Sequence, residues 1–299
     1  MVETSRRLRL DERRLHAMRS TWWRSSKGVL RYYNLTNEWD AQAGGTTSLD
    51  ADEYVSLSRD VFPWLKAIDS GIVVMSGGIS DKGIRERLIE RLLDLRGLQL
   101  VDAISIHPYV WSHRSRPNPE AALDNFDYVE SVARAANGGK EVPLYITEIV
   151  WPTHAGRFGL NDDEASWFLR PYFIHAASRT YVRWSFWYWQ QDQGDDPTKM
   201  EHRFGFFGRP ERLWPAAREF RRIVDLLSPG DRMTSKAQNR RWVAEFSSSG
   251  AVIGRFCWLE ADDEGSKAMG ASMRYGSAQA MDSLRRLYWT AVSGASGAR

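Results

Sequence analysis

Residues 143–153 read PLYITEIVWPT, a short apolar run that leads into a polar cluster around Glu148. Between about residues 10 and 227, runs of this kind alternate with longer amphipathic segments. This alternation is typical of strand-helix units that build a parallel sheet, so it predicts an α/β fold. The expected strands are Val29–Leu35, Gly71–Ser76, Asp102–Ile106, Leu144–Thr147 and Tyr181–Trp187.

The segments between these strands carry helix signals. Asp50 followed by Glu53 has the spacing of a capping box. Pro63 is expected to kink the helix that starts there, or to end it early, because proline cannot donate a backbone hydrogen bond. The other expected helices run between Ser80 and Gly97, from Phe126 to near Gly138 and Gly139, from Asn161 with its partner Glu164, and from Pro215 to Leu227.

The pattern changes after Ser228, Pro229 and Gly230. Residues 241–246 and 251–259 predict two strands joined by a turn at 247–250, a hairpin rather than another strand-helix unit. Beyond Glu260 the sequence is rich in Gly, Ser, Ala and charge, with poor periodicity. We therefore predict a main domain over residues 1–230 and a small β appendage with a loose tail over 231–299.

Length and charge limit the classes of protein to consider. The 299 residues are 42% hydrophobic, enough to bury one large core, and this size fits an α/β barrel. The formal charge of +3 is small, and basic residues are spread among acidic ones, so nucleic acid is not implied. No apolar run has the length of a signal peptide or a membrane span. We expect neither nucleic acid nor a membrane as a partner; compartment and oligomeric state stay open.

The sequence carries no sign of a cofactor. Cys257 is the single cysteine, so neither an intrachain disulfide nor a cysteine-based metal site can form. The six histidines lack metal-ligand spacing, and neither a glycine-rich phosphate loop nor a nucleophilic serine elbow is present. We therefore expect no metal and no cofactor.

Two expected strands end in a glutamate. RYYNLTNEWD places Asn37 and Glu38 after the first strand, and PLYITEIVWPT places Glu148 after the fourth. The carboxyl ends of parallel barrel strands converge on one face, so we expect the two glutamates to face each other there. Retaining cleavage of a glycosidic bond needs such a pair about 5 Å apart, one acid and one nucleophile. Taken singly, each glutamate could also be an ordinary surface residue.

Four motifs carry a family resemblance. Asn37-Glu38 resembles the dipeptide that ends the fourth strand of retaining glycosidases of clan A, which are (β/α)8 barrels, and ITEIVWPT resembles their seventh-strand nucleophile motif. VDAISIHPYVW resembles the sixth strand and WSFWYWQQDQG the eighth. The order is also that of the clan, and the sequence is most similar to family 39, with families 5 and 17 as rivals. The resemblance covers about residues 10–227, and family 39 barrels often carry a small β domain like the predicted hairpin.

The resemblance implies roles for particular residues. It makes Glu38 the general acid/base and Glu148 the nucleophile of a double displacement on a poly- or oligosaccharide. Asn37 would bind the sugar 2-hydroxyl or cap the strand, Tyr109 would hold the nucleophile, and His107 would contact substrate or orient a carboxylate. Further candidates for stacking on sugar, unless they pack in the core, are Trp151, Trp187 and Trp189.

The chain is short before Glu38. Clan members place three strand-helix units there, whereas this chain has 37 residues, of which Leu10–Ser26 resembles the third helix. We therefore expect a TIM-type barrel incomplete at its N-terminus, with about five units. Two functions follow as alternatives: a glycosidase whose N-terminal part is missing from the sequence, or an inactive fragment that binds carbohydrate or a partner. The sugar, the linkage and the choice of exo or endo action are not predicted.

Overall fold

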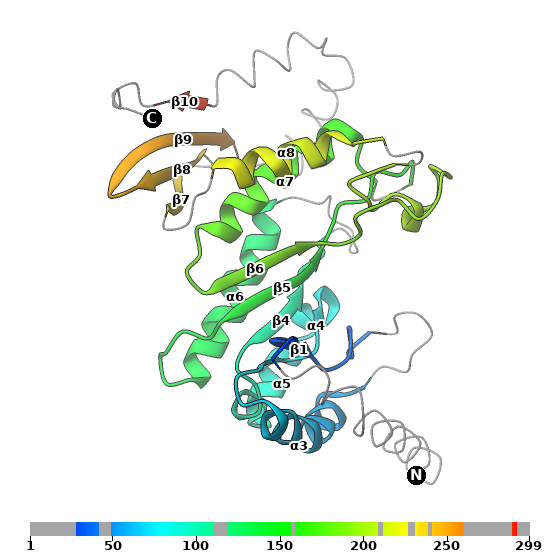
Figure 1. Cartoon of the computed structure of the whole chain (residues 1–299), viewed down its shortest axis with the longest axis vertical. Coiled ribbons are helices and arrows are strands. Elements are labelled where there is room, and N and C mark those ends of the chain that lie inside the picture. Colours follow the sequence, from blue (N-terminus) through cyan, green and yellow to red (C-terminus); the bar gives the residue numbers. More distant parts are fainter. Residues whose placement is uncertain are drawn as a thin grey trace. The chain divides into compact units, whose positions relative to one another are not determined.

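The structure is a computed structural model (Figure 1), which describes residues 28–41, 49–110, 119–156, 159–208, 212–226, 231–238, 241–259 and 289–291. The expected helix at Leu10–Ser26 and most of the expected loose tail lie outside these residues. By its internal contacts the chain divides into two compact units. Residues 1–105 and 133–143 form the first, and residues 106–132 and 144–299 form the second.

Short parallel strands form the sheet elements of the first unit. β1 (Tyr32–Asn34) pairs in parallel with β2 (Val73–Met75), with Tyr32 opposite Val73. A further parallel bridge joins Met75 to Ala103, directly before β4 (Ile104–His107), whose first two residues belong to this unit. The first three predicted strands are thus confirmed in position. The short strand β3 (Ile79–Ser80), a neighbour of β4, was not predicted.

The helices of the first unit confirm one expectation and correct two. α3 (Ala51–Ile68) begins with the expected capping box, in which the Asp50 and Glu53 side chains each accept from the other residue's backbone N–H. The expectation that Pro63 ends this helix early is wrong: α3 continues to Ile68. Pro63 is exposed, so water can reach the carbonyl that loses its partner.

The helix expected between Ser80 and Gly97 is divided into short pieces. These are α4 (Asp81–Arg85), α5 (Leu88–Asp94) and the 3-10 helix η1 (Gly97–Gln99). The breaks fall at Arg87 and Arg96, which adopt left-handed backbone conformations with φ of 62° and 59°. The break at Arg96 lies directly before Gly97, where the helix was expected to stop, whereas neither glycine nor proline stands at Arg87, so the apolar periodicity alone does not predict that break.

Two parallel strands and two helices build the core of the second unit. β5 (Leu144–Ile149) pairs in parallel with β6 (Val182–Trp187), and β4, β5 and β6 are neighbours in that order (Figure 1). α7 (Asp162–Ala177) starts with the predicted Asn161–Glu164 capping box and packs on β6. α6 (Pro119–Ala136) ends next to two glycines with positive φ, as expected. The last two strand predictions are confirmed.

The C-terminal region is an antiparallel sheet. The predicted hairpin is confirmed as β8 (Arg241–Ser248) and β9 (Ala251–Leu259), whereas β7 (Arg232–Gln238) and β10 (Trp289–Ala291) were missed. Buried side chains of this sheet share a hydrophobic cluster with Ile174 of α7. The helix α8 (Pro215–Leu226) starts at Pro215 as predicted and packs against α7. A domain boundary at residue 230 stays a prediction.

The described elements establish an α/β fold with parallel strand pairs. Among the described residues, no helix combines the length and the apolar character needed to cross a membrane.

Candidate active site

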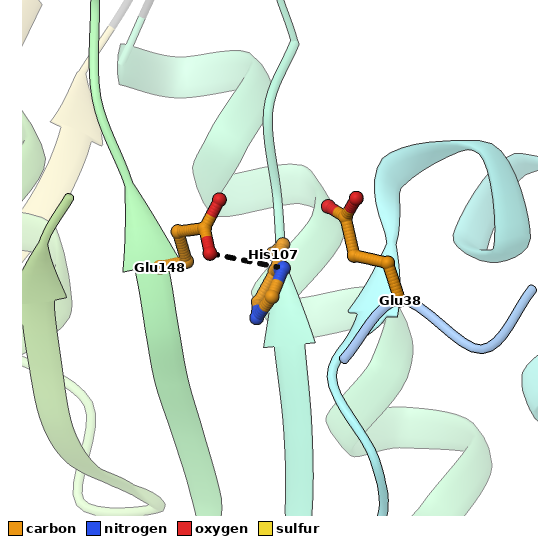
Figure 2. Close-up of side chains that lie close together, drawn as sticks. All are labelled: Glu38, His107 and Glu148. Carbon is orange, nitrogen blue, oxygen red and sulfur yellow. Dashed lines mark ion pairs between the residues drawn. The ribbon is translucent and has the colours of Figure 1, made fainter. Parts of the chain in front are cut away.

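Glu148 is held from two sides near the end of β5. Its Oε1 accepts a hydrogen bond from the Tyr109 hydroxyl at 2.5 Å. Its Oε2 lies 3.8 Å from His107 Nδ1, within ion-pair range of a protonated imidazole (Figure 2). The side chain of Glu148 is 17% exposed, so it remains reachable from solvent. A short hydrogen bond from a hydroxyl to a carboxylate stabilises negative charge there.

The end of β4 supplies both partners. His107 is the last residue of the strand, and the Tyr109 N–H donates to the His107 carbonyl at 2.9 Å, so the chain turns directly after the strand. The two rings meet edge to face, with centroids 6.3 Å apart. The motif His-Pro-Tyr thus aims two polar side chains at one carboxylate.

A bulge in β5 brings two consecutive side chains to the same histidine. Ile146 pairs with Ser185 and Ile149 with Trp187, so β5 has one residue more than β6 over this interval. Consecutive side chains of a regular strand point to opposite faces, and a bulge relaxes this alternation. Here Thr147 Oγ1 lies 3.0 Å from His107 Nε2, while the neighbouring Glu148 faces Nδ1. The sequence did not reveal Thr147 as a partner because the bulge leaves no sequence signal.

Burial makes His107 a rigid support. Its side chain is 1% exposed, and both ring nitrogens face polar atoms of β5. Of the two roles expected for His107, this geometry favours orienting the carboxylate over contact with a substrate. Within the second unit, His107 and Glu148 could each offer one ligand atom to a metal ion. Two such atoms are one fewer than the three protein ligands of a typical catalytic zinc.

Asn37 and Glu38 lie on the first unit, in a turn rather than at the end of a strand. β1 ends at Asn34, so three residues separate the end of the strand from Glu38. Asn37 forms a parallel bridge with Gly78 and is exposed, and the half-buried Glu38 has a φ of 42°, in the left-handed region. Non-glycine residues occupy this region at a cost, and such residues are frequent at functional sites.

The three candidate tryptophans differ in exposure. Trp151 is 1% exposed and packs against Tyr172 with ring centroids 5.2 Å apart, so its ring has no open face in this structure. Trp187 is half-buried and stacks on Phe206 at 4.7 Å. Trp189 is 45% exposed and has a φ of 63°, which is unusual for a bulky residue. Trp189 is therefore the most exposed of the three rings.

The loop after β6 is organised by a buried carboxylate. Asp192 is 1% exposed and accepts hydrogen bonds from the Gly205 N–H at 2.8 Å and from Trp214 Nε1 at 3.0 Å. Burial raises the pKa of Asp192, and the two hydrogen bonds and the nearby Arg203 oppose this shift. Asp192 thus supports the loop that follows Trp189.

Comparisons with known proteins give structural matches only. No family model matches the sequence, and no curated protein matches it. A solved family 39 glycoside hydrolase from the gut symbiont Bacteroides cellulosilyticus WH2 is similar in structure, with a TM-score of 0.62 and 21% identity. The similarity covers 79% of this chain and 49% of that one. The chain therefore spans about half the length of this relative.

A second solved structure gives a weaker match. A glucosidase from Croceicoccus marinus has a TM-score of 0.50 and 13% identity, over 72% of this chain and 47% of the other. The structural neighbours are thus glycoside hydrolases with barrel folds, and the resemblance predicted from the sequence motifs is confirmed at the level of the fold. Identities this low show a common fold, and one fold can host many activities.

Proposed function

We propose that this chain carries the catalytic carboxylates of a retaining glycoside hydrolase, with Glu148 as nucleophile and Glu38 as general acid/base. The observation that carries the proposal is the Glu148 carboxylate near a strand end, hydrogen-bonded by Tyr109 and flanked by the buried His107. The matching fold proposal is a (β/α)8 barrel of which the chain contains about five strand-helix units.

The proposed reaction proceeds in two displacements. Glu148 attacks the anomeric carbon while Glu38 gives its proton to the departing glycosidic oxygen, which leaves a glycosyl ester on Glu148. Glu38, now a carboxylate, takes a proton from a water molecule, and the oxygen of that water attacks the same anomeric carbon. The ester bond to Glu148 breaks, which releases its carboxylate. Two inversions at one carbon retain the configuration of the sugar.

The Tyr109 hydroxyl has a specific part in this scheme. It holds Oε1 of Glu148 and thereby restricts rotation of the carboxylate, which leaves Oε2 to attack. As the ester forms, Glu148 loses its negative charge and the hydrogen bond weakens, so Tyr109 also helps to expel the carboxylate in the second step.

The proposed substrate is an O-glycoside of a poly- or oligosaccharide. The exposed side chain of Asn37 is proposed to bind the 2-hydroxyl, where a hydrogen bond strengthens in the transition state. Trp189, and to a smaller extent Trp187, are proposed to stack on sugar rings, because flat aromatic faces match the apolar faces of pyranoses.

An alternative function is a carbohydrate-binding module without hydrolysis. Two large side chains of β6, Trp184 and Phe186, are 43% and 46% exposed, and their rings meet edge to face at 5.7 Å. Exposed aromatic pairs of this kind suit sugar binding that involves neither glutamate. Titration of oligosaccharides into the Glu148→Gln variant, with and without Trp184→Ala, measures this binding separately.

The test of hydrolysis is stereochemical. The chain is incubated with 4-nitrophenyl glycosides of the common pyranoses, and NMR follows the anomer first released. Retention of configuration is expected, and an activated 2-deoxy-2-fluoro glycoside should label the peptide that contains Glu148. Inversion, or labelling of another carboxylate, would contradict the proposal.

A further inference from the structure

Glu38 belongs to a tight turn with an unusual backbone. The Ala41 N–H donates to the Glu38 carbonyl at 2.9 Å, which closes a turn over residues 38–41. Glu38 has a φ of 42° in this turn, a conformation that an L-residue keeps only where its surroundings enforce it. The side chains of the two central residues, Trp39 and Asp40, are both buried, with 3% exposure each. The turn is therefore held by what these two side chains contact.

Trp39 attaches the turn to the core of the first unit. Its ring stacks on Tyr54 of α3 with centroids 4.5 Å apart, and its Nε1 donates to the Gly77 carbonyl at 3.3 Å. The Tyr54 hydroxyl accepts from the Gly77 N–H at 2.5 Å. Stacking on Tyr54 and the hydrogen bond to Gly77 thus fix the position of Trp39 in the turn.

Asp40 attaches the turn to the start of α4 through both carboxylate oxygens. Oδ1 accepts from the Ser80 N–H at 3.1 Å, and Oδ2 accepts from the Ser80 hydroxyl at 2.6 Å. Ser80 is the N-cap of α4, and its hydroxyl oxygen also accepts from the Gly83 N–H at 3.2 Å. A two-point attachment of this kind removes the rotation of the side chain and so fixes the backbone on which Glu38 sits.

Gly83 is the residue that lets this carboxylate approach. A Cβ added at Gly83 would lie 2.1 Å from Asp40 Oδ2, well inside contact distance. Alanine is otherwise the better residue within a helix. The absence of a side chain at this place is thus matched to the position of Asp40.

We propose that Asp40 is the positioning residue of Glu38: its bond pair to Ser80 holds the 38–41 turn so that the Glu38 carboxyl points at the leaving oxygen of a substrate. The inference rests on the proposed function, in which Glu38 is the general acid/base. Asp40 is not a catalytic residue, because its carboxylate is buried and engaged with Ser80.

The test compares substrates whose leaving groups do or do not need a proton. Asp40→Ala, Asp40→Asn and Gly83→Ala are assayed on a 2,4-dinitrophenyl glycoside and on the methyl glycoside of the same sugar. If Asp40 acts through Glu38, kcat/KM for the methyl glycoside falls about 100-fold in Asp40→Ala, since a misplacement of about 1 Å has this effect. Formation of the glycosyl ester from the dinitrophenyl glycoside should slow far less, because this leaving group departs without a proton. Asp40→Asn keeps one acceptor oxygen, so its kcat/KM for the methyl glycoside should lie between those of the wild type and of Asp40→Ala.

The control is Asp52→Ala, which removes a carboxylate of α3 from the same unit whose ion pair is with Arg91 of α5. Circular dichroism checks that each variant folds. If Asp40→Ala does not fold, Gly83→Ala answers the same question. It displaces the Asp40 carboxylate, and alanine itself favours the helix. Equal losses on both substrates in the Asp40 and Gly83 variants would overturn the inference.

Glu38→Gln separates failure of the inference from failure of the proposed function. If Glu38→Gln shows the dependence on the leaving group and the Asp40 variants do not, the positioning role alone is wrong. If the wild-type chain does not hydrolyse either glycoside, or Glu38→Gln affects both equally, the proposed function fails and the inference with it. The same dependence in both sets of variants supports both.

Discussion

The two glutamates at the centre of the proposal are held in opposite ways. Glu148 sits in a bulged but otherwise regular parallel strand, and its carboxylate is contacted directly, by Tyr109 at 2.5 Å and by His107 at 3.8 Å. Glu38 sits in a turn with a left-handed backbone, and the anchoring side chains belong to its neighbours Trp39 and Asp40. The described contacts of Glu148 are made by its own carboxylate, and those of the turn that carries Glu38 are made by the side chains of Trp39 and Asp40.

This difference matches the two proposed roles. A nucleophile must keep its charge and its angle of attack, and direct contacts to the carboxylate provide both. A general acid/base must change its protonation state twice in each cycle, and an anchored backbone keeps its carboxyl group in place in both states.

Glu148→Gln should have the largest effect. The amide cannot form the glycosyl ester, so hydrolysis should fall by about 10⁴-fold or more on every glycoside, because the loss of a nucleophile leaves only residual catalysis. Initial rates with 4-nitrophenyl glycosides measure this. Glu141→Gln, a change shortly before the same strand, should leave the rate near that of the wild type. A tenfold loss or less in Glu148→Gln would rule out a nucleophilic role.

Glu38→Gln should have a large effect that depends on the leaving group. Hydrolysis of a methyl glycoside should fall by about 10² to 10⁴-fold, the usual contribution of a general acid. The rate at which a dinitrophenyl glycoside forms the glycosyl ester on Glu148 should be nearly unchanged, since that leaving group departs without a proton. The burst of dinitrophenol and the steady-state rate separate the two steps. A loss of the same size on both substrates would argue against the acid role.

Tyr109→Phe should have an intermediate effect. It removes the contact that restricts rotation of the Glu148 carboxylate, so kcat/KM should fall about 10 to 100-fold because the attacking oxygen is misplaced. The rate of labelling by a 2-deoxy-2-fluoro glycoside should fall in parallel, because that step depends on Glu148. Tyr172→Phe is the matched control: it removes a hydroxyl that contacts Ser185 at 2.8 Å, away from Glu148. A labelling rate unchanged by Tyr109→Phe would mean that the hydrogen bond does not assist attack.

The smallest expected effect concerns stability and the second unit alone. His175 of α7 is fully buried, with Ser235 at 3.3 Å and Glu120 at 3.7 Å; Arg179 and Asp127 are the further charges that act on it. Burial lowers the pKa of His175 from the usual 6.5, and Glu120 partly opposes this. As the pH falls, His175 therefore binds a proton in the unfolded chain before it does so in the folded chain. The free energy of unfolding should therefore fall as the pH drops below about 6.5, with a slope no steeper than about 1.4 kcal/mol per pH unit.

Urea unfolding between pH 5 and 8 measures this slope. His175→Gln keeps a polar side chain of similar size and should flatten the curve through this range. The rate of glycoside hydrolysis relative to folded protein should not change with this substitution. A variant curve as steep as that of the wild type would show that another group is responsible.

Several elements could be predicted because their cause is local. The capping boxes at Asp50 and Asn161 depend on side chains three residues apart, and both were predicted correctly. The hairpin of β8 and β9 follows from two apolar runs separated by a short polar turn. The strands β1, β2, β4, β5 and β6 coincide with the expected apolar runs to within a few residues.

The failures have a non-local cause. Pro63 does not end α3, because the helix is stabilised by its buried face, which runs on to Leu65. The left-handed break at Arg87 divides the helix although the apolar spacing continues through Leu88 and Leu92, so residue spacing by itself does not predict it.

The sequence by itself determined the order of the five main parallel strands and placed Glu38 and Glu148 after two of them, because these features depend on residue type and short spacing; the resemblance of its motifs added His107 and Tyr109 as candidates. Only the tertiary structure decided how the candidates are held. The bulge that turns both Thr147 and Glu148 toward His107, the burial of Trp151, and the attachment of Asp40 to Ser80 all depend on contacts between residues distant in the chain. The physical reason is that close packing and burial select one conformation among the several that each local sequence allows.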